Sequence, residues 1–156
     1  MHTQDFVTNY NRQCRRSSMN VVEMYARVEN GQKLKLYESK VPAGFPSPAE
    51  AFIKSELSAD DYLVRNPRST VYIRVEGNSM TGAKIFDGDV IVVDKSLTQR
   101  KGNIVVVWIE GDGYTVKYLG DDRLIPANPK YPIIYFLEGM NIKFFGVVVG
   151  VMRRFD

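Results

Sequence analysis

The segment Gly77–Met80 places a serine in the kind of turn that a nucleophile needs. Its sequence is Gly-Asn-Ser-Met, and it closely follows a run of β-branched and aromatic residues, Val71–Val75. A serine nucleophile requires a tight turn that presents its hydroxyl and directs backbone amides at a developing oxyanion. Gly-Asn-Ser is also ordinary turn chemistry, so Ser79 alone does not establish an active site. A suitable general base elsewhere in the sequence would favour the active-site interpretation over an ordinary turn.

Histidine is a poor candidate for that base. The chain has 1 histidine, His2, beside the amino terminus, where ordered structure is least expected. Lysine can take its place only when neutral, and an unperturbed lysine with a pKa of about 10.4 is neutral in roughly one molecule in 2,500 at pH 7. Burial in apolar surroundings raises that fraction. The base is therefore expected on an apolar strand.

Lys117 is the lysine that fits this requirement. In the run Tyr114–Leu119, alternation puts Lys117 on the same face as Thr115 and Leu119. An outward-facing strand lysine is the alternative, and it is common on base rates. Other lysines fall in a predicted helix, in polar turns or at an exposed strand end: Lys54, Lys95, Lys101, Lys130 and Lys143. No serine is followed three residues later by lysine, so the Ser-x-x-Lys helix of penicillin-binding proteins is absent.

Several segments together resemble the self-cleaving serine peptidases of the LexA and UmuD family. In chain order they are Ala43–Ala49, Gly77–Met80, Ile85–Asp94, Thr115–Lys117 and Phe145–Val148. The first is similar to the segment containing the bond that the family cuts in itself, and it holds the only Ala-Gly dipeptide in the chain. The resemblance runs from about Pro42 to the end of the chain. It implies a β-rich Ser-Lys peptidase domain.

The resemblance also implies roles for individual residues. Ser79 is expected to attack the carbonyl carbon of Ala43, and neutral Lys117 to remove the serine proton. Backbone amides around Ser79 and Met80 are expected to stabilise the oxyanion. Cleavage would then separate Ala43 from Gly44. No metal and no cofactor is implied.

Two departures from the family pattern stand near Lys117. Tyr118 follows it where a basic residue is usual, and the turn Glu110–Gly113 is slightly long. Neither touches the Ser-Lys pair, although both could alter how the cleavage segment docks.

The length of the chain before the cleavage segment indicates a branch of the family. LexA and phage repressors carry a helix-turn-helix domain there, which 43 residues with a hairpin pattern cannot supply. The UmuD branch therefore matches better. It implies a homodimer, cleavage stimulated by the RecA nucleoprotein filament, and a shortened product that acts with an error-prone Y-family polymerase in the SOS response. The basic stretch Arg12–Arg16 is interpreted as a solvated arm, and no direct sequence-specific DNA binding is expected.

The elements that must position these residues can be read from periodicity. Apolar residues alternate from Val22 to Val28 and again at Leu34 and Leu36, around Asn30-Gly31, which predicts a β-hairpin. Val41–Pro46 predicts an extended segment. Ser47 reads as the N-cap of a short helix running through Ala51, Phe52, Ile53 and Leu57, with helical structure ending before Pro67.

From Thr70 onward, short apolar runs separated by Gly, Asp and Asn predict strands. The runs are Val71–Val75, Val90–Val93, Ile104–Ile109, Tyr114–Leu119, Ile133–Leu137 and Ile142–Met152. We therefore expect a mainly β fold with an antiparallel or mixed core, divided into an arm at 1–43 and a peptidase domain at 44–156. The near-continuous apolar run Phe144–Met152 predicts either a dimer interface or a central core strand.

Composition bounds the function classes. With 44% hydrophobic and 25% charged residues the 156-residue chain has ordinary globular composition. The longest stretches without a charge, Val41–Ala49 and Phe144–Met152, are too short to span a bilayer. A single cysteine, Cys14, and no apolar leader favour the reducing cytoplasm. Two other functions stay open: a soluble relative of signal peptidase, and a non-catalytic β-rich interaction module.

Overall fold

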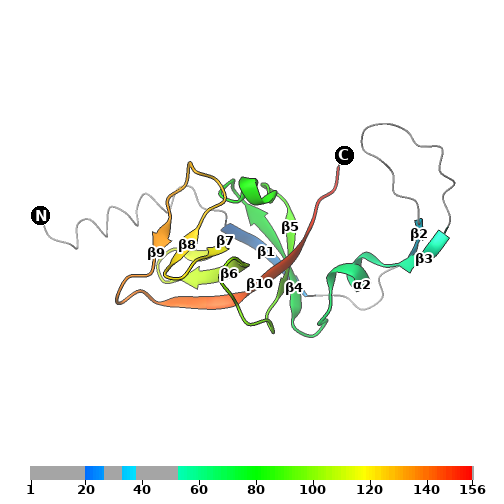
Figure 1. Cartoon of the computed structure of the whole chain (residues 1–156), viewed down its shortest axis with the longest axis horizontal. Coiled ribbons are helices and arrows are strands. Elements are labelled where there is room, and N and C mark those ends of the chain that lie inside the picture. Colours follow the sequence, from blue (N-terminus) through cyan, green and yellow to red (C-terminus); the bar gives the residue numbers. More distant parts are fainter. Residues whose placement is uncertain (1–19, 27–32, 38–52, 156) are drawn as a thin grey trace, which may run out of the picture. The chain divides into compact units, whose positions relative to one another are not determined.

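A computed structural model of the protein describes residues 20–26, 33–37 and 53–155 (Figure 1). The chain forms two compact units. The larger one comprises Met1–Arg27 and Asn66–Asp156, and the smaller one comprises Val28–Arg65. The sequence-based division between residues 43 and 44 marks a predicted cleavage site and not the edge of a compact unit. The two compact units therefore do not test it.

The larger unit is an eight-stranded sheet in which neighbouring strands are antiparallel. The strand order is β1-β4-β5-β10-β6-β7-β8-β9. The strands are β1 (Asn20–Ala26), β4 (Thr70–Glu76), β5 (Val90–Asp94), β6 (Ile104–Ile109), β7 (Gly113–Leu119), β8 (Arg123–Ile125), β9 (Ile134–Tyr135) and β10 (Ile142–Met152). A mainly β fold with an antiparallel or mixed core was expected; it is confirmed, and the sheet is antiparallel.

The sheet closes on itself through its first strand. Along most of its length β1 pairs with β4, and its first residue, Asn20, also pairs with Thr115 of β7. The strands β1, β4, β5, β10, β6 and β7 therefore form a closed circuit of pairings, and β8 and β9 extend it from β7. Closure of this kind protects sheet edges and brings β4 and β7 near a common strand.

The smaller unit contains a two-stranded sheet and a short helix. Strand β2 (Leu34–Tyr37) pairs antiparallel with β3 (Ile53–Leu57), and helix α2 (Ala59–Leu63) follows. Ser58 is the N-cap, because its Oγ accepts a hydrogen bond of 2.9 Å from the Asp61 amide. The carboxylates of Asp60 and Asp61 lie in the first turn, where the helix dipole favours negative charge.

Two local predictions were wrong. The strands on either side of Asn30-Gly31 exist, but they do not pair with each other, since β1 pairs with β4 and β2 pairs with β3. Alternation shows that a segment is half-buried without naming its partner. Ile53 and Leu57 lie in strand β3, not in a helix, and the helix begins after Ser58. The expected cap at Ser47, with Ala51 and Phe52, lies outside the described residues.

The predicted strands of the larger unit are confirmed, two of them with the predicted bounds. Those two are β6 and β10, whose apolar runs are bounded by turn residues. Strand β9 is shorter than the predicted run Ile133–Leu137, and β8 was not predicted. Tertiary packing decides such short strands, because three or two residues carry too little periodicity of their own.

Strand β6 contributes to two hydrophobic cores, one on each face. Its residue Val106 packs with Ile73, Met80, Ile91 and others, and its neighbours Val105 and Val107 pack with Leu124 and Val147. Successive strand residues point to opposite faces, so a strand buried on both sides joins two clusters. Met80, directly after Ser79, is fully buried in the first cluster.

Strand β10 is central, lying between β5 and β6. Gly146 makes this possible where β10 crosses β5, because a Cβ there would lie 2.7 Å from Val93 Cγ1 and 2.9 Å from Asp94 O. Of the two interpretations of the apolar run Phe144–Met152, the central strand is therefore observed. A dimer interface on its exposed face stays a prediction.

The described residues contain no helix long and apolar enough to cross a membrane. They also hold no group of three or more His, Cys, Asp or Glu side chains that could bind a metal ion.

Candidate active site

Ser79 lies in the turn between β4 and a one-turn 3-10 helix, η1 (Thr81–Ala83). Gly77 starts the turn with φ 96°, a conformation that disfavours any side chain, and Met80 is the N-cap residue of η1. Both Ser79 and Met80 are fully buried. Ser79, the candidate nucleophile, therefore lies below the surface. Met80, whose amide was predicted to help form the oxyanion hole, lies below the surface as well.

Lys117 reaches Ser79 from strand β7. Its Nζ donates to Ser79 Oγ at 2.9 Å, to Thr115 Oγ1 at 3.0 Å and to the carbonyl oxygen of Val116 at 3.0 Å. The side chain is 1% exposed. The structure thus brings together Ser79 and Lys117, which sequence reasoning paired across 38 residues of chain.

This geometry suits both protonation states of the amine. As an ammonium group, Lys117 has three donors for its three neighbours. As a neutral amine it has two donors and one lone pair, which can accept the hydroxyl proton of Ser79. Burial away from water penalises the ammonium form, whereas the surrounding oxygens stabilise it. The balance between these effects decides which protonation state the site holds.

Tyr118, which departs from the family pattern, lies on the face of strand β7 that is turned away from Ser79. Tyr118 lies on the opposite face from Lys117 and packs against the core cluster that contains Val116. Thr115 and Lys117 lie on the other face, toward Ser79. The unusual tyrosine therefore leaves the Ser79–Lys117 contact unaffected.

A neighbouring segment, Ala127–Asn128, holds the serine turn in place. Asn128 Nδ2 donates to the carbonyl oxygen of Asn78 at 2.9 Å, and the Gly82 amide donates to Ala127 O at 3.0 Å. Gly82 must be glycine, because a Cβ there would lie 2.0 Å from Ala127 O. Sequence reasoning missed Asn128, since its partner lies 50 residues away and its flanking prolines indicate only a turn.

The far end of the same loop is closed by Asp89. Its backbone carbonyl accepts from the Val75 amide at 2.9 Å, and Gly88 N donates to Val75 O at 2.9 Å. Nearby, Asp87 Oδ1 accepts from the Gly77 amide at 2.7 Å. Residues 77–89 are therefore a loop whose two ends are hydrogen-bonded together at the junction of β4 and β5.

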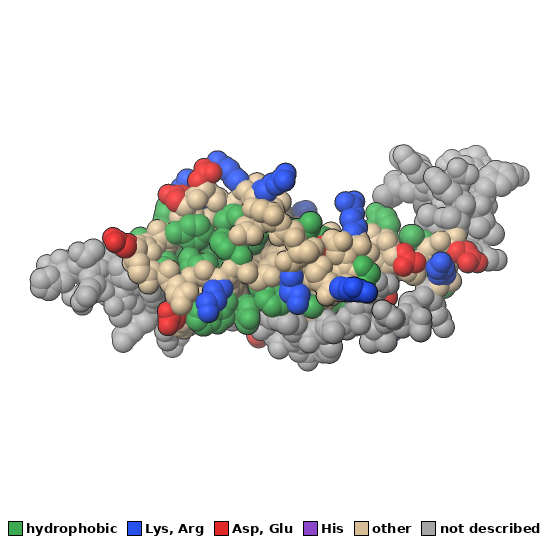
Figure 2. Space-filling view, turned by 90° about the horizontal axis from the view of Figure 1, so that it is seen from below, with side chains coloured by type: hydrophobic (Ala, Val, Ile, Leu, Met, Phe, Trp, Pro, Cys, Tyr) green, Lys and Arg blue, Asp and Glu red, His purple; other side chains and the backbone are tan. Residues whose placement is uncertain are grey.

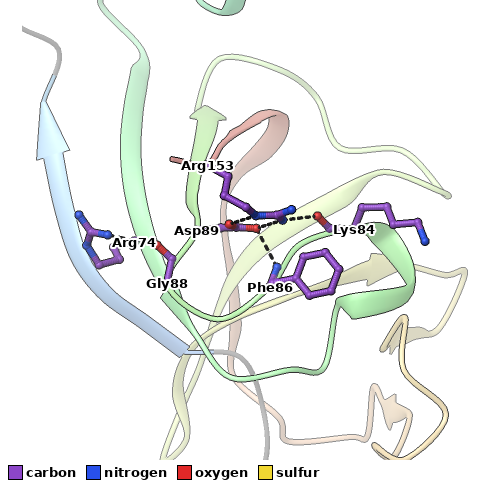
Figure 3. Close-up of polar contacts among 6 residues, drawn as sticks. All are labelled: Arg74, Lys84, Phe86, Gly88, Asp89 and Arg153. Carbon is purple, nitrogen blue, oxygen red and sulfur yellow. Dashed lines mark hydrogen bonds and ion pairs between the residues drawn. The ribbon is translucent and has the colours of Figure 1, made fainter. Parts of the chain in front are cut away.

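The carboxylate of Asp89 is buried beside Arg153, at the end of β10 (Figure 3). Its oxygens accept from Arg153 Nε at 2.7 Å, from Arg153 Nη2 at 2.5 Å and from the Phe86 amide at 2.8 Å. Burial by itself would raise the pKa of Asp89, but the hydrogen bonds from Arg153 and Phe86 and the charge of Arg153 outweigh it and hold the pKa below its ordinary value. The carboxylate is ionised at neutral pH.

The predicted cleavage site, Ala43-Gly44, lies outside the described residues. Ser79 and Lys117 are therefore placed relative to each other, and the bond that they are expected to cut is not.

Comparisons with known proteins identify the family of the chain. Residues 35–149 match the family model described as Peptidase S24-like. Protein MucA of Salmonella typhimurium is 42% identical over 116 residues, covering 72% of this chain and 79% of the relative. Protein SamA of the same species is 37% identical over 122 residues, covering 76% and 84%.

A longer relative matches less of its own length. The LexA repressor of Halorhodospira halophila is 40% identical over 119 residues, which cover 73% of this chain and 52% of the repressor. The MucA-type and SamA-type relatives are instead matched over most of their length. The chain therefore belongs to the Peptidase S24-like family of LexA- and UmuD-like proteins, and within it to the UmuD branch.

Proposed function

We propose that this protein is a self-cleaving serine peptidase that uses Ser79 as nucleophile and Lys117 as base. The hydrogen bond of 2.9 Å between two fully buried side chains, Lys117 Nζ and Ser79 Oγ, is the observation that carries the proposal. Membership of a peptidase family supports it.

The reaction would proceed in two halves. Ser79 Oγ bonds to the Ala43 carbonyl carbon while its proton passes to neutral Lys117, and amides of the serine turn stabilise the oxyanion. The bond between Ala43 and Gly44 then breaks, and the amine of Gly44 takes the proton from Lys117. In the second half Lys117 deprotonates a water molecule, which hydrolyses the Ala43 ester and restores Ser79.

Cleavage should depend on both side chains and on pH. Ser79→Ala and Lys117→Ala should each leave the chain intact under alkaline conditions that split the wild type. The wild-type rate should rise with pH, because only the neutral amine accepts the serine proton. Gel electrophoresis measures the rate, and mass spectrometry should find Gly44 as the new amino terminus.

Thr70→Val is a suitable control for handling and folding. Thr70 is buried, lies away from the serine turn, and donates a hydrogen bond from its hydroxyl to Asn66 O. Complete cleavage of either Ser79→Ala or Lys117→Ala would overturn the assignment. An intact wild-type chain at every pH would favour a non-catalytic interaction module.

We also propose that the protein acts in SOS mutagenesis as a cytoplasmic homodimer. Its relatedness to proteins MucA and SamA supports the role in SOS mutagenesis. Self-cleavage would be stimulated by the RecA filament on single-stranded DNA, and the shortened product would serve an error-prone Y-family polymerase in translesion synthesis. Coprecipitation of residues 44–156 with such a polymerase subunit, compared with the full chain, tests the last step.

A further inference from the structure

We propose that Arg153 and Asp89 form a clamp that positions Ser79 for attack. Arg153, the residue directly after β10, would then be a positioning residue of the active site. The proposal rests on the function proposed above. It concerns how the serine loop, residues 77–89, is held, and neither residue of the clamp touches the reacting atoms.

One guanidinium group contacts three residues of this loop (Figure 3). Arg153 binds both carboxylate oxygens of Asp89 through Nε and Nη2. The same Nη2 donates to the carbonyl oxygen of Lys84 at 2.9 Å, and the group lies 4.4 Å from the ring centroid of Phe86. A planar fork of donors can satisfy these contacts together, whereas a lysine ammonium cannot reproduce their geometry.

Lys84 transmits this contact toward Ser79. It is the residue that ends η1, with φ 63°, the one positive φ outside glycine among the described residues. Its amide donates to Thr81 O at 3.0 Å, and Ile85 N donates to Met80 O at 3.3 Å. The backbone from Met80 to Ile85 is thus a single hydrogen-bonded turn whose far end Arg153 holds.

The backbone on both sides of Ser79 is therefore attached to distant parts of the chain. Asn128 holds the carbonyl of Asn78 on one side of Ser79, and Arg153 holds that of Lys84 on the other. Without Arg153, the strained Lys84 turn would lose an anchor and Asp89 would keep a buried charge. A displacement of about 1 Å at the reacting atoms can reduce a rate roughly 100-fold, so a small relaxation of η1 is enough to matter.

The clamp can be tested without the cleavage segment. A fluorophosphonate probe reports the reactivity of Ser79, because Ser79 Oγ bonds to phosphorus while fluoride leaves. We expect Arg153→Ala to reduce the labelling rate about 10- to 100-fold. Arg154→Ala is the matched control, since it removes the adjacent exposed arginine and should label as the wild type does.

Two further measurements separate positioning from general stability. A cleft of about 630 Å³ is lined by residues that include Arg74, Val90, Met152 and Arg153, so a small guanidinium compound can reach the vacated position. Ethylguanidinium, at concentrations too low to unfold the protein, should restore labelling of Arg153→Ala but not of Asp89→Asn. Arg153→Lys should keep a near wild-type melting temperature and still label about 10-fold more slowly.

The outcomes distinguish the clamp from the peptidase itself. If the wild type is neither labelled nor cleaved at alkaline pH, the proposed function fails and the clamp with it. If the wild type is labelled and Arg153→Lys reacts at the same rate, the clamp is overturned while the Ser-Lys mechanism stands. This holds even if Arg153→Ala does not fold.

Discussion

At the scale of single residues, Thr115 has the most direct influence on Lys117. Its hydroxyl accepts from Nζ at 3.0 Å, and it is 4% exposed. A hydrogen bond to a charged group contributes more than one to a neutral group, so this contact favours the ammonium form over the amine. The same contact also orients Nζ toward Ser79. Thr115 therefore both restrains and directs the base.

Replacing Thr115 should separate these two effects. In Thr115→Val the ammonium form loses an acceptor, so the amine becomes neutral at lower pH and the cleavage-rate profile moves toward lower pH. The maximal rate should fall about 10-fold, because Nζ is less well oriented. Self-cleavage measured from neutral to alkaline pH checks both. A profile that does not move, or that moves upward, would contradict the assigned role, and Thr70→Val again serves as control.

The residues of the site differ in how far the sequence could predict them. Neither a serine in a glycine-bordered turn nor a lysine within an apolar strand is rare by itself, and Ser79 and Lys117 could be predicted because both lie in segments that resemble one peptidase family. Asp89 lies in the family-like segment Ile85–Asp94, but its pairing with Arg153 could not be predicted, because an arginine near the chain end is an ordinary surface residue. Their contact joins positions 64 residues apart, which only the closed sheet brings together.

At the scale of elements, strand prediction succeeded where a nearly continuous apolar run defines the strand. The runs of β6 and β10 are apolar on both faces and end at turn residues, so their bounds follow from the sequence. The pairing partner of β1 could not be predicted, because β4 lies more than 40 residues further along the chain. The part of the helix prediction that included Ile53 and Leu57 was wrong because these residues pair with β2, and the observed N-cap is Ser58, whereas Ser47 lies outside the described residues.

The start of β4 and the end of β5 are joined by a buried carboxylate. Asp94 is 2% exposed and accepts from Asn66 Nδ2 at 2.7 Å, Ser69 Oγ at 3.1 Å, Ser96 N at 2.8 Å and Ser96 Oγ at 2.6 Å. Burial would raise the pKa of Asp94, but the hydrogen bonds from Ser96, Asn66 and Ser69 outweigh it and lower the pKa. The ionised form therefore stabilises the folded state.

This carboxylate predicts a sensitivity to acid. Because the pKa is lower in the folded than in the unfolded chain, stability is complete above the unfolded value of about 3.9 and is lost as pH falls through the folded value. Asp94→Asn should reduce the free energy of unfolding at pH 7 by about 1.5–3 kcal/mol. It should also lose less stability than the wild type between pH 5 and pH 3. Urea unfolding at these pH values measures the difference.

Asp121→Asn is the control for this experiment. Asp121 forms an exposed ion pair with Lys101, of a kind that contributes little. A wild-type loss of stability in acid that persists unchanged in Asp94→Asn would show that other carboxyl groups, such as Asp89, cause it.

At the scale of the whole molecule, the apolar surface around β10 predicts self-association. Trp108, Tyr114, Phe144 and Phe145 line a groove of about 350 Å³ together with Lys143. Val149 and Val151 are 43% and 36% exposed further along β10. Figure 2 shows one face of the protein, on which hydrophobic side chains gather among scattered Lys and Arg side chains. Patches of this kind mark interaction sites.

Phe144→Glu should therefore convert a dimer into a monomer. Phe144 is 38% exposed, so a charge there should cost little in the free subunit and much in a desolvated interface. Light scattering at micromolar concentration measures the change, and Tyr62→Glu, at an exposed residue of the smaller unit, is the control. A wild type that is already a monomer would remove the dimer proposal.

The predicted cleavage segment and Ser79 fall, by residue number, in different units of the chain. Ala43 and Gly44 belong to the unit Val28–Arg65, and Ser79 belongs to the other. A tethered segment meets its target at an effective concentration of about a millimolar, so a segment that docked freely would destroy the intact protein soon after synthesis. We therefore expect docking to be a minor state.

A filament that stimulates cleavage must bind this docked state more tightly than the undocked one. A shift from 1% to 99% docked needs about 5.5 kcal/mol of differential binding.

Purified protein mixed at neutral pH with RecA, single-stranded DNA and a nucleoside triphosphate should be cleaved faster than protein alone, with Gly44 as the new amino terminus. Arg153→Ala should be slowed with and without the filament by the same factor, since the clamp acts on Ser79 and not on docking. No acceleration, or a cut elsewhere, would remove the damage-response function and leave a peptidase without this control.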